Sequence, residues 1–157
     1  MSEREQLTLA DVREKIDGIR TAMLTTPDET GELSSRPLTI QDIDEQGHVA
    51  FVVGKDADWV TGRPTKANLA VSDEHVWVSI AGTLTFTDDP KLLDELWDEF
   101  TDAFFENGKA DATVAHLDAS TWEYWTAPNK LTQAFRIGKA FVTGGKTDLG
   151  ASGTIET

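Results

Sequence analysis

The chain has 157 residues, and its 28 Asp and Glu against 14 Lys and Arg give a formal net charge of −14. This length suits one domain with a sizeable core, and the strong negative charge argues against binding to nucleic acid or to an anionic membrane. The sequence has no cysteine, no long apolar run and no N-terminal signal region, which excludes disulfides and thiol chemistry, and we expect a cytoplasmic protein without a membrane span.

The first predicted element is a helix over residues 8–18. Thr8 and Asp11 resemble a capping box, with Asp in place of the usual Glu. Apolar residues such as Val12 and Ile16 then follow at helical spacing. This pattern is typical of an amphipathic helix with one buried face.

Short strands are predicted through the middle of the chain. The turn-forming stretch PDETG, residues 27–31, separates β-rich residues 20–26 from residues 33–40, which indicates a hairpin. Successive strands with short connections favour a mainly β (α+β) fold, in which an antiparallel sheet forms a barrel with helices packed outside it. Further strands are predicted over residues 48–53, 67–71, 75–81, 83–87, 113–117 and 121–125.

Two later helices are predicted outside this barrel. The first covers residues 90–105, because Pro90 fits a first turn and an apolar stripe follows, which we expect to pack on the barrel. The second begins at Asn129 and reaches Phe141, and the remaining residues 147–157 are expected to be disordered. The apolar stripe of the first helix consists of Leu93, Leu96, Trp97, Phe100 and Phe104.

The segment SSRPLTI, residues 34–40, places Arg36 and Pro37 side by side within a predicted strand. Because proline has no N–H to donate to a sheet, it belongs on an edge or at a bulge. Arg36 could pair with one of the many carboxylates while Pro37 guards the edge, or it could bind an anionic ligand. Other chemical signals are absent, since the three histidines lack metal-ligand spacing and no phosphate-loop or nucleophile motif occurs.

An ordered series of segments resembles the general stress protein 26 branch of the pyridoxamine 5′-phosphate oxidase-like, FMN-binding split barrels. The resemblance implies a six-stranded antiparallel split β-barrel over residues 1–146 that forms a homodimer, with a flavin between the subunits and an oxidoreductase function. The segments that carry it are LTT (24–26), SRPL (35–38), HVAFVVGKDADWV (48–60), VWVSIAGTLTFTDD (76–89), ELW (95–97), FFENGKADATVAHLD (104–118), WEYW (122–125) and KAFVTG (139–144).

The resemblance also implies a set of cofactor-binding residues. An Arg on the second strand of such barrels binds the flavin phosphate, and the residues after it present their backbone to the isoalloxazine ring. The matching positions here begin at Arg36. The full implied set is Arg36, Pro37, Leu38 and Thr39, then Val52, Val53, Lys55, Ala57 and Trp59, and finally Trp125 as a ring near the isoalloxazine.

Two positions depart from the family pattern. Ala57 stands where family members have a phosphate-binding Ser, and Trp59 stands where they have Lys. The loss of two charge-assisted hydrogen bonds would weaken FMN binding roughly 10²-fold, although Lys55 or Arg63 could substitute. Trp59 is consistent with plain packing or with stacking on a different ligand, such as FAD or the deazaflavin F420. A non-enzymatic module that has lost its flavin therefore remains a second interpretation.

A basic stretch lies near the C-terminus of this acidic chain. Residues 124–147 contain four Lys and Arg residues and no acid. They could dock against the acidic helix predicted over residues 90–105, or they could supply positive potential for an anionic cofactor. A true pyridoxamine phosphate oxidase is not expected, because the chain lacks the Arg- and His-rich C-terminal segment of those enzymes.

Overall fold

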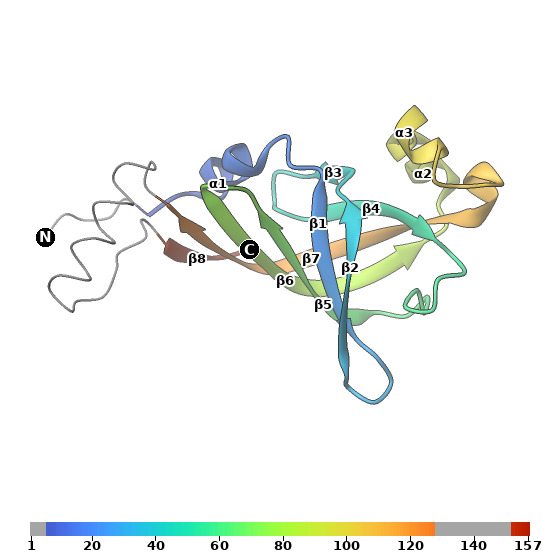
Figure 1. The fold of residues 1–157 in the computed structure, drawn as a ribbon, viewed down its shortest axis with the longest axis horizontal. Coiled ribbons are helices and arrows are strands. Elements are labelled where there is room, and N and C mark those ends of the chain that lie inside the picture. Colours follow the sequence, from blue (N-terminus) through green and yellow to red (C-terminus); the bar gives the residue numbers. More distant parts are fainter. Residues whose placement is uncertain (1–5, 128–151) are drawn as a thin grey trace, which may run out of the picture.

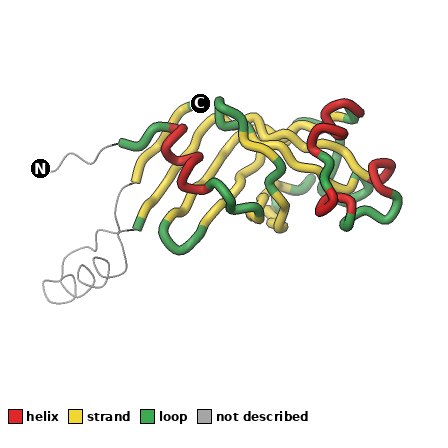
Figure 2. Tube along the Cα trace, turned by 90° about the horizontal axis from the view of Figure 1, so that it is seen from above, coloured by secondary structure: helices red, strands yellow, loops and turns green. Residues whose placement is uncertain are grey.

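Eight strands form a single curled sheet in the computed structural model, which describes residues 6–127 and 152–157 (Figure 1). The strands are β1 (Thr21–Pro27), β2 (Leu33–Thr39), β3 (Asp42–Ile43), β4 (Val49–Gly54), β5 (Thr65–Ser72), β6 (Val76–Thr87), β7 (Ala112–Thr126) and β8 (Ser152–Glu156). The helices are α1 (Leu9–Ile16), α2 (Pro90–Leu96), α3 (Glu99–Asp102) and a 3₁₀ turn at Gly108–Asp111. Figure 2 shows α2 and α3 at the end of the sheet opposite α1.

The strand order leaves one gap in the barrel. Neighbours follow the order β2-β1-β5-β6-β7-β4-β3, β8 adds to β7, and every pairing is antiparallel. The sheet curls until β2, at one end, lies close to β4 near the other end, although no ladder joins them. The prediction of a mainly β, antiparallel split barrel with few helices is therefore confirmed.

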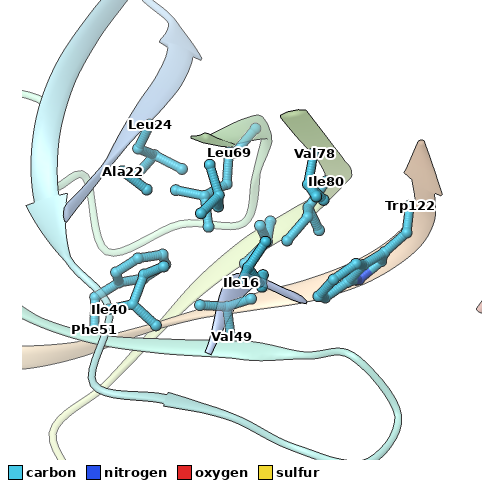
Figure 3. Packing of buried hydrophobic residues seen from close by; sticks show 14 of the residues in the cluster. Ile16, Ala22, Leu24, Ile40, Val49, Phe51, Leu69, Val78, Ile80 and Trp122 are labelled. Atoms are coloured by element: carbon cyan, nitrogen blue, oxygen red, sulfur yellow. The ribbon is translucent and has the colours of Figure 1, made fainter. Parts of the chain in front are cut away.

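The inner face of the curled sheet holds the core. Alternate residues of each strand point inward, as the two-residue period of a strand requires. Helix α1 closes one end of the core with Val12 and Ile16, and the indole of Trp122 donates a hydrogen bond of 3.0 Å to the carbonyl of Gly47. Fully buried side chains around these include Leu24, Val49, Phe51, Leu69, Ile80 and Trp122 (Figure 3).

The two pairs of short strands expected at residues 75–87 and 113–125 are instead two long strands. β6 and β7 each run unbroken, and their pairing shifts register once, at Ala81 and Gly82. A Cβ on Gly82 would lie 2.1 Å from the Asp118 carbonyl oxygen, so only glycine allows the strands to approach here. Gly82 therefore lies within one long strand, opposite a bulge in β7 where Ser120 has no partner in the ladder.

The helix predicted over residues 90–105 is broken. Helix α2 ends at Leu96, Trp97 is extended, and Asp98 caps the short helix α3 by accepting hydrogen bonds from the Thr101 amide and hydroxyl, at 2.7 and 2.8 Å. The side chain of Asp98 thus offers the backbone an alternative to continuing the helix, which a stripe pattern does not reveal.

The C-terminal tail also differs from the sequence prediction. Disorder was expected over residues 147–157, but Ser152–Glu156 pairs with β7 as strand β8. Gly153 lies over the Tyr124 ring, where a Cβ would be 2.5 Å from the tyrosine oxygen, and Ile155 packs against the core. Pairing with β7 thus makes a strand of a polar segment that has little β propensity of its own. The helix predicted from Asn129 and most of the basic stretch lie outside the described residues.

Candidate functional site

The strand register puts Arg36 on the inner face of the barrel. In the β1–β2 ladder Arg36 lies opposite Leu24, and Ser34 lies opposite Thr26. Leu24 and Thr26 are both buried on the inner face, and directly opposed residues share a face. The charged side chain therefore points toward the interior, at the edge strand where the barrel is split.

Pro37 removes no hydrogen bond from the β1–β2 ladder. The Ile40 amide donates to the Arg20 carbonyl at 2.6 Å, and the Asp28 amide donates to the Glu32 carbonyl at 2.8 Å, so the even positions of β2 bond to β1. Because antiparallel ladders alternate, the backbone of Pro37 faces away from β1. The missing N–H thus falls on the free edge, where Pro37 offers no donor to another strand.

The facing edge belongs to β4. The Lys55 amide donates to the Asp111 carbonyl at 2.9 Å, which continues the odd-numbered β4 bonds to β7. The alternate positions, Val52 and Gly54, therefore turn their backbone groups away from β7, and β3 pairs only as far as Ala50. Two strand edges thus border the split of the barrel.

The Arg36 guanidinium is held by neutral partners. Its Nη1 donates to the Thr26 hydroxyl at 2.8 Å and to the Leu24 carbonyl at 3.3 Å, and its Nη2 donates to the Ser34 hydroxyl at 2.7 Å. Its Cζ lies 4.7 Å from the centre of the Trp59 ring, a cation–π arrangement. No ion pair joins Arg36 to a carboxylate within residues 6–127 and 152–157. Burial lowers the pKa of Arg36, and no described acid offsets that cost.

A groove of about 740 Å³ opens beside this cation. One wall is β2, another is β4 with the loop that follows it, and α3 with the segment after it closes one end. The groove brings together eight of the ten residues that the resemblance implied. These are Arg36, Pro37, Leu38, Thr39, Val52, Val53, Ala57 and Trp59.

The other two implied residues lie elsewhere. Lys55 lines a separate depression with Asp94 and Lys109 beside α2. Trp125 lies opposite Trp77 in the β6–β7 ladder and is 44% exposed. Neither residue borders the groove of its own chain, and the cofactor roles of all ten residues stay predictions.

Aromatic residues around α3 border the groove, which the sequence did not indicate. Phe100 and Phe104 are 53% and 67% exposed, and their ring centres lie 5.1 Å apart. They were expected to pack on the barrel as part of one long helix, but the break at Trp97 redirects them. Gln41 donates a hydrogen bond of 3.0 Å to the Thr101 hydroxyl and so joins α3 to the segment after β2.

The charge of the groove suits a ligand with one compact anionic group. An arginine has five N–H donors. Arg36 uses three of them in hydrogen bonds to described residues, so the others remain for a phosphate oxygen. Asp56, Glu106 and Asp111 also line the groove and oppose any further negative charge. The donor set fits a single phosphate at Arg36 with an uncharged planar group beyond it.

Two further features were sought in the described part of the chain. It contains no cluster of three or more His, Cys, Asp or Glu residues that could hold a metal ion. Nor does it contain a helix with the length and apolar character needed to cross a membrane.

A curled antiparallel sheet whose β2 and β4 edges face each other across one gap, with an arginine on its inner face, defines a split β-barrel protein. The sequence matches the family described as pyridoxamine 5′-phosphate oxidase like over residues 8–148, and the chain belongs to this family. The resemblance to its general stress protein 26 branch is confirmed. No curated protein matches the sequence significantly.

Solved structures share this fold. One described as a general stress protein 26 from Jannaschia sp. CCS1 superposes with a TM-score of 0.71 at 24% identity, and the match covers 95% of this chain and 100% of that chain. A general stress FMN/FAD binding protein from Xanthomonas citri gives a TM-score of 0.60 at 30% identity, over 71% of this chain and 82% of that chain.

Proposed function

We propose that the protein is a cytoplasmic flavoprotein that holds FMN in the groove, with the phosphate at Arg36. The observation that carries this proposal is the position of the Arg36 guanidinium and the set of groups that hydrogen-bond to it. It lies on the inner face of an edge strand, is bound only by a carbonyl and two hydroxyls within the described chain, and borders a groove. A planar, delocalised cation in such a place is suited to bind phosphate oxygens.

The backbone groups and apolar side chains of this chain would hold the isoalloxazine ring. The free edges of β2 at Pro37–Thr39 and of β4 at Val52 and Gly54 present carbonyl and amide groups to a ring in the split. Leu38 and Val52 add apolar side chains, and Trp59 covers the cation from one side. A bound flavin supplies electron-transfer chemistry, so an oxidoreductase function needs no nucleophile or acid–base pair from the protein.

The groove would be completed by a second copy of the chain. Met23 on β1 and Trp77 and Trp125 on β6 and β7 are large apolar side chains with 43%, 39% and 44% of their surface exposed. Such exposure on one sheet is typical of an association surface. In a homodimer that joins these faces, Trp125 would act across the interface, which accounts for its distance from the groove of its own chain.

The first experiment titrates FMN and riboflavin into the purified protein and measures flavin absorbance and fluorescence. Arg36→Gln removes the charge, and we expect FMN affinity to fall by about 10- to 100-fold. Riboflavin, which lacks the phosphate, should bind both proteins equally. Lys91→Gln, an equal change of charge on an exposed α2 residue outside the groove, is the control. Equal loss of FMN and riboflavin affinity in Arg36→Gln would contradict the assignment.

One observation favours a different function. Three carboxylates line the groove against one arginine, and the hydroxyl and cation of the family pattern are replaced by Ala57 and Trp59. A non-enzymatic barrel that has lost tight flavin binding and now binds another ligand or a partner would fit this charge balance. A colourless protein with no measurable affinity for FMN, FAD or F420 would favour this alternative.

A further inference from the structure

The end of the groove that lies at α3 carries exposed aromatic rings. Phe100 and Phe104 line the groove with 53% and 67% of their surface exposed, and their ring centres lie 5.1 Å apart in an edge-to-face arrangement. Phe105 lines the same end, but it packs against Trp97 with ring centres 5.4 Å apart. Exposed apolar side chains that gather on the wall of a groove are typical of a binding surface, so Phe100 and Phe104 need an explanation that packing alone does not supply.

The position of these rings is fixed from outside the groove. Arg20 lines a neighbouring cavity beside α1 and α2 rather than the groove. Its Nη2 lies 3.5 Å from a carboxylate oxygen of Asp98, and its Cζ lies 5.5 Å from the centre of the Phe100 ring. Asp98 also caps α3, and the Phe104 amide donates to the Thr101 carbonyl at 3.0 Å, so the segment that carries both rings is held in place. Because the charge of Arg20 is paired with Asp98, it adds little positive potential to the groove.

The same end of the groove is acidic. Glu106 and Asp111 line it in the segment that follows α3, and Asp56 lines the groove from the loop after β4. The Asp111 carboxylate accepts a hydrogen bond of 3.1 Å from the Asn107 amide. No described Lys, Arg or His forms an ion pair with any of the three carboxylates, and Arg36 is the sole cation among the described residues that line the groove. The potential at the α3 end therefore disfavours an anion and favours a positive charge.

We infer that the α3 end of the groove binds an aromatic organic cation, a planar ring that carries a permanent positive charge. Aromatic side chains attract a cation through their π electrons and carboxylates attract it by their charge, so both kinds of lining residue act on one ligand. An uncharged ring would use the phenylalanines but not the carboxylates. A metal ion would not use the exposed rings, and the described part of the chain contains no cluster of three or more His, Cys, Asp or Glu residues that could hold one.

Binding of this cation is independent of a flavin, whereas its role as the second substrate rests on the proposed function. A flavin ring that extends from Arg36 along Pro37–Thr39 would lead toward Gln41, whose side-chain amide donates to the Thr101 hydroxyl of α3 at 3.0 Å. The cation would then lie beside the far end of the isoalloxazine ring. An aromatic cation is therefore the class of second substrate that we expect for a flavin held in this groove.

Equilibrium dialysis of the flavin-free protein against three ring compounds tests the inference. The probes are the cation 1-methylquinolinium, its analogue quinoline, which is uncharged at neutral pH, and the anion quinoline-2-carboxylate, each measured by ultraviolet absorbance at one low salt concentration. We expect the cation to bind about tenfold or more tightly than quinoline, and the anion to bind more weakly than either. Equal affinity for the cation and quinoline, or no binding of the cation, would overturn the inference. Because flavin is absent, this result and the FMN titration can fail independently.

Substitutions at the α3 end separate this site from the general negative charge of the protein. Glu106→Gln should weaken 1-methylquinolinium by about three- to tenfold and leave quinoline unchanged, because only the cation interacts with the lost charge. Phe104→Leu should weaken both by about threefold or more, because both lose a ring contact. Glu45→Gln, an equal change of charge at an exposed residue outside the groove, is the control and should change neither. Equal effects of the two Glu substitutions on cation binding, or an unchanged cation affinity in Phe104→Leu, would overturn the site.

Discussion

Trp59 places an aromatic ring where family members have a positively charged side chain. Family members have Lys at this position, but here an indole covers the Arg36 guanidinium at 4.7 Å and packs on Phe86, with ring centres 6.3 Å apart. The sequence left packing and ligand stacking open, and the structure shows that Trp59 packs against both the core and the cation. A cation–π contact of this kind contributes about 0.5–2 kcal/mol, and it holds the guanidinium without adding charge for a phosphate.

The double substitution Ala57→Ser/Trp59→Lys restores the family pattern. If Arg36 binds the flavin phosphate, the added hydroxyl and cation should raise FMN affinity by about tenfold or more and leave riboflavin unchanged. Trp59→Phe keeps an aromatic face and should stay within about threefold of the wild type. Fluorescence titration measures all three proteins. An unchanged or weaker FMN affinity in the double variant would place the phosphate elsewhere.

At the scale of the element, the bend shared by β6 and β7 determines the shape of the barrel. The register shifts between Ala81 and Gly82, opposite Ala119, and the two strands continue on either side of the shift. One bulge in two long strands lets a single sheet curl far enough to bring β2 close to β4. The groove therefore depends on a glycine that lies outside it.

Gly82→Ala should destabilise the fold. The new Cβ would lie 2.1 Å from the Asp118 carbonyl oxygen, so backbone must move, and we expect a loss of about 1–3 kcal/mol in the free energy of unfolding, measured by urea denaturation. Gly54→Ala is the control, because a Cβ there meets no atom within 4 Å. Similar unfolding midpoints for the two variants would contradict the close approach of β6 and β7.

At the scale of the whole molecule, three large exposed apolar residues lie on the outer face of the sheet that forms the core. Trp77 and Trp125 are directly paired across β6 and β7, and Met23 lies on β1. The formal net charge of −14 favours solubility, but it does not explain why large apolar side chains are exposed on this face. The proposed homodimer would bury it.

The substitution Trp77→Ser/Trp125→Ser tests the dimer. We expect the wild-type protein to have the mass of a dimer by light scattering and the variant to shift to the monomer, since loss of two buried aromatic contacts removes much of an interface energy. Leu33→Ser, which changes a 71% exposed residue at the start of β2, is the control and should remain dimeric. A monomeric wild type would refute the dimer.

The sequence by itself determined the local features of this protein. Alternation indicated most of the strands, and the capping box of Thr8 and Asp11 indicated the start of α1. These features depend on neighbours within a few residues, so sequence patterns report them directly. The segment that follows Arg36, together with the family resemblance, likewise led to most of the groove.

Tertiary structure decided what depends on contacts between distant residues. Gly82 lies within a continuous strand because β7 approaches it closely with a bulge at Ser120. Ser152–Glu156 forms a strand because it pairs with β7, and Phe100 lies at the groove because Asp98 caps a separate helix after α2 ends. Lys55 lines a depression beside α2, and Trp125 pairs with Trp77 in the β6–β7 ladder, so neither lies at the groove of its own chain. Burial and pairing between distant segments outweigh local propensity at these points, and only the folded chain shows where they act.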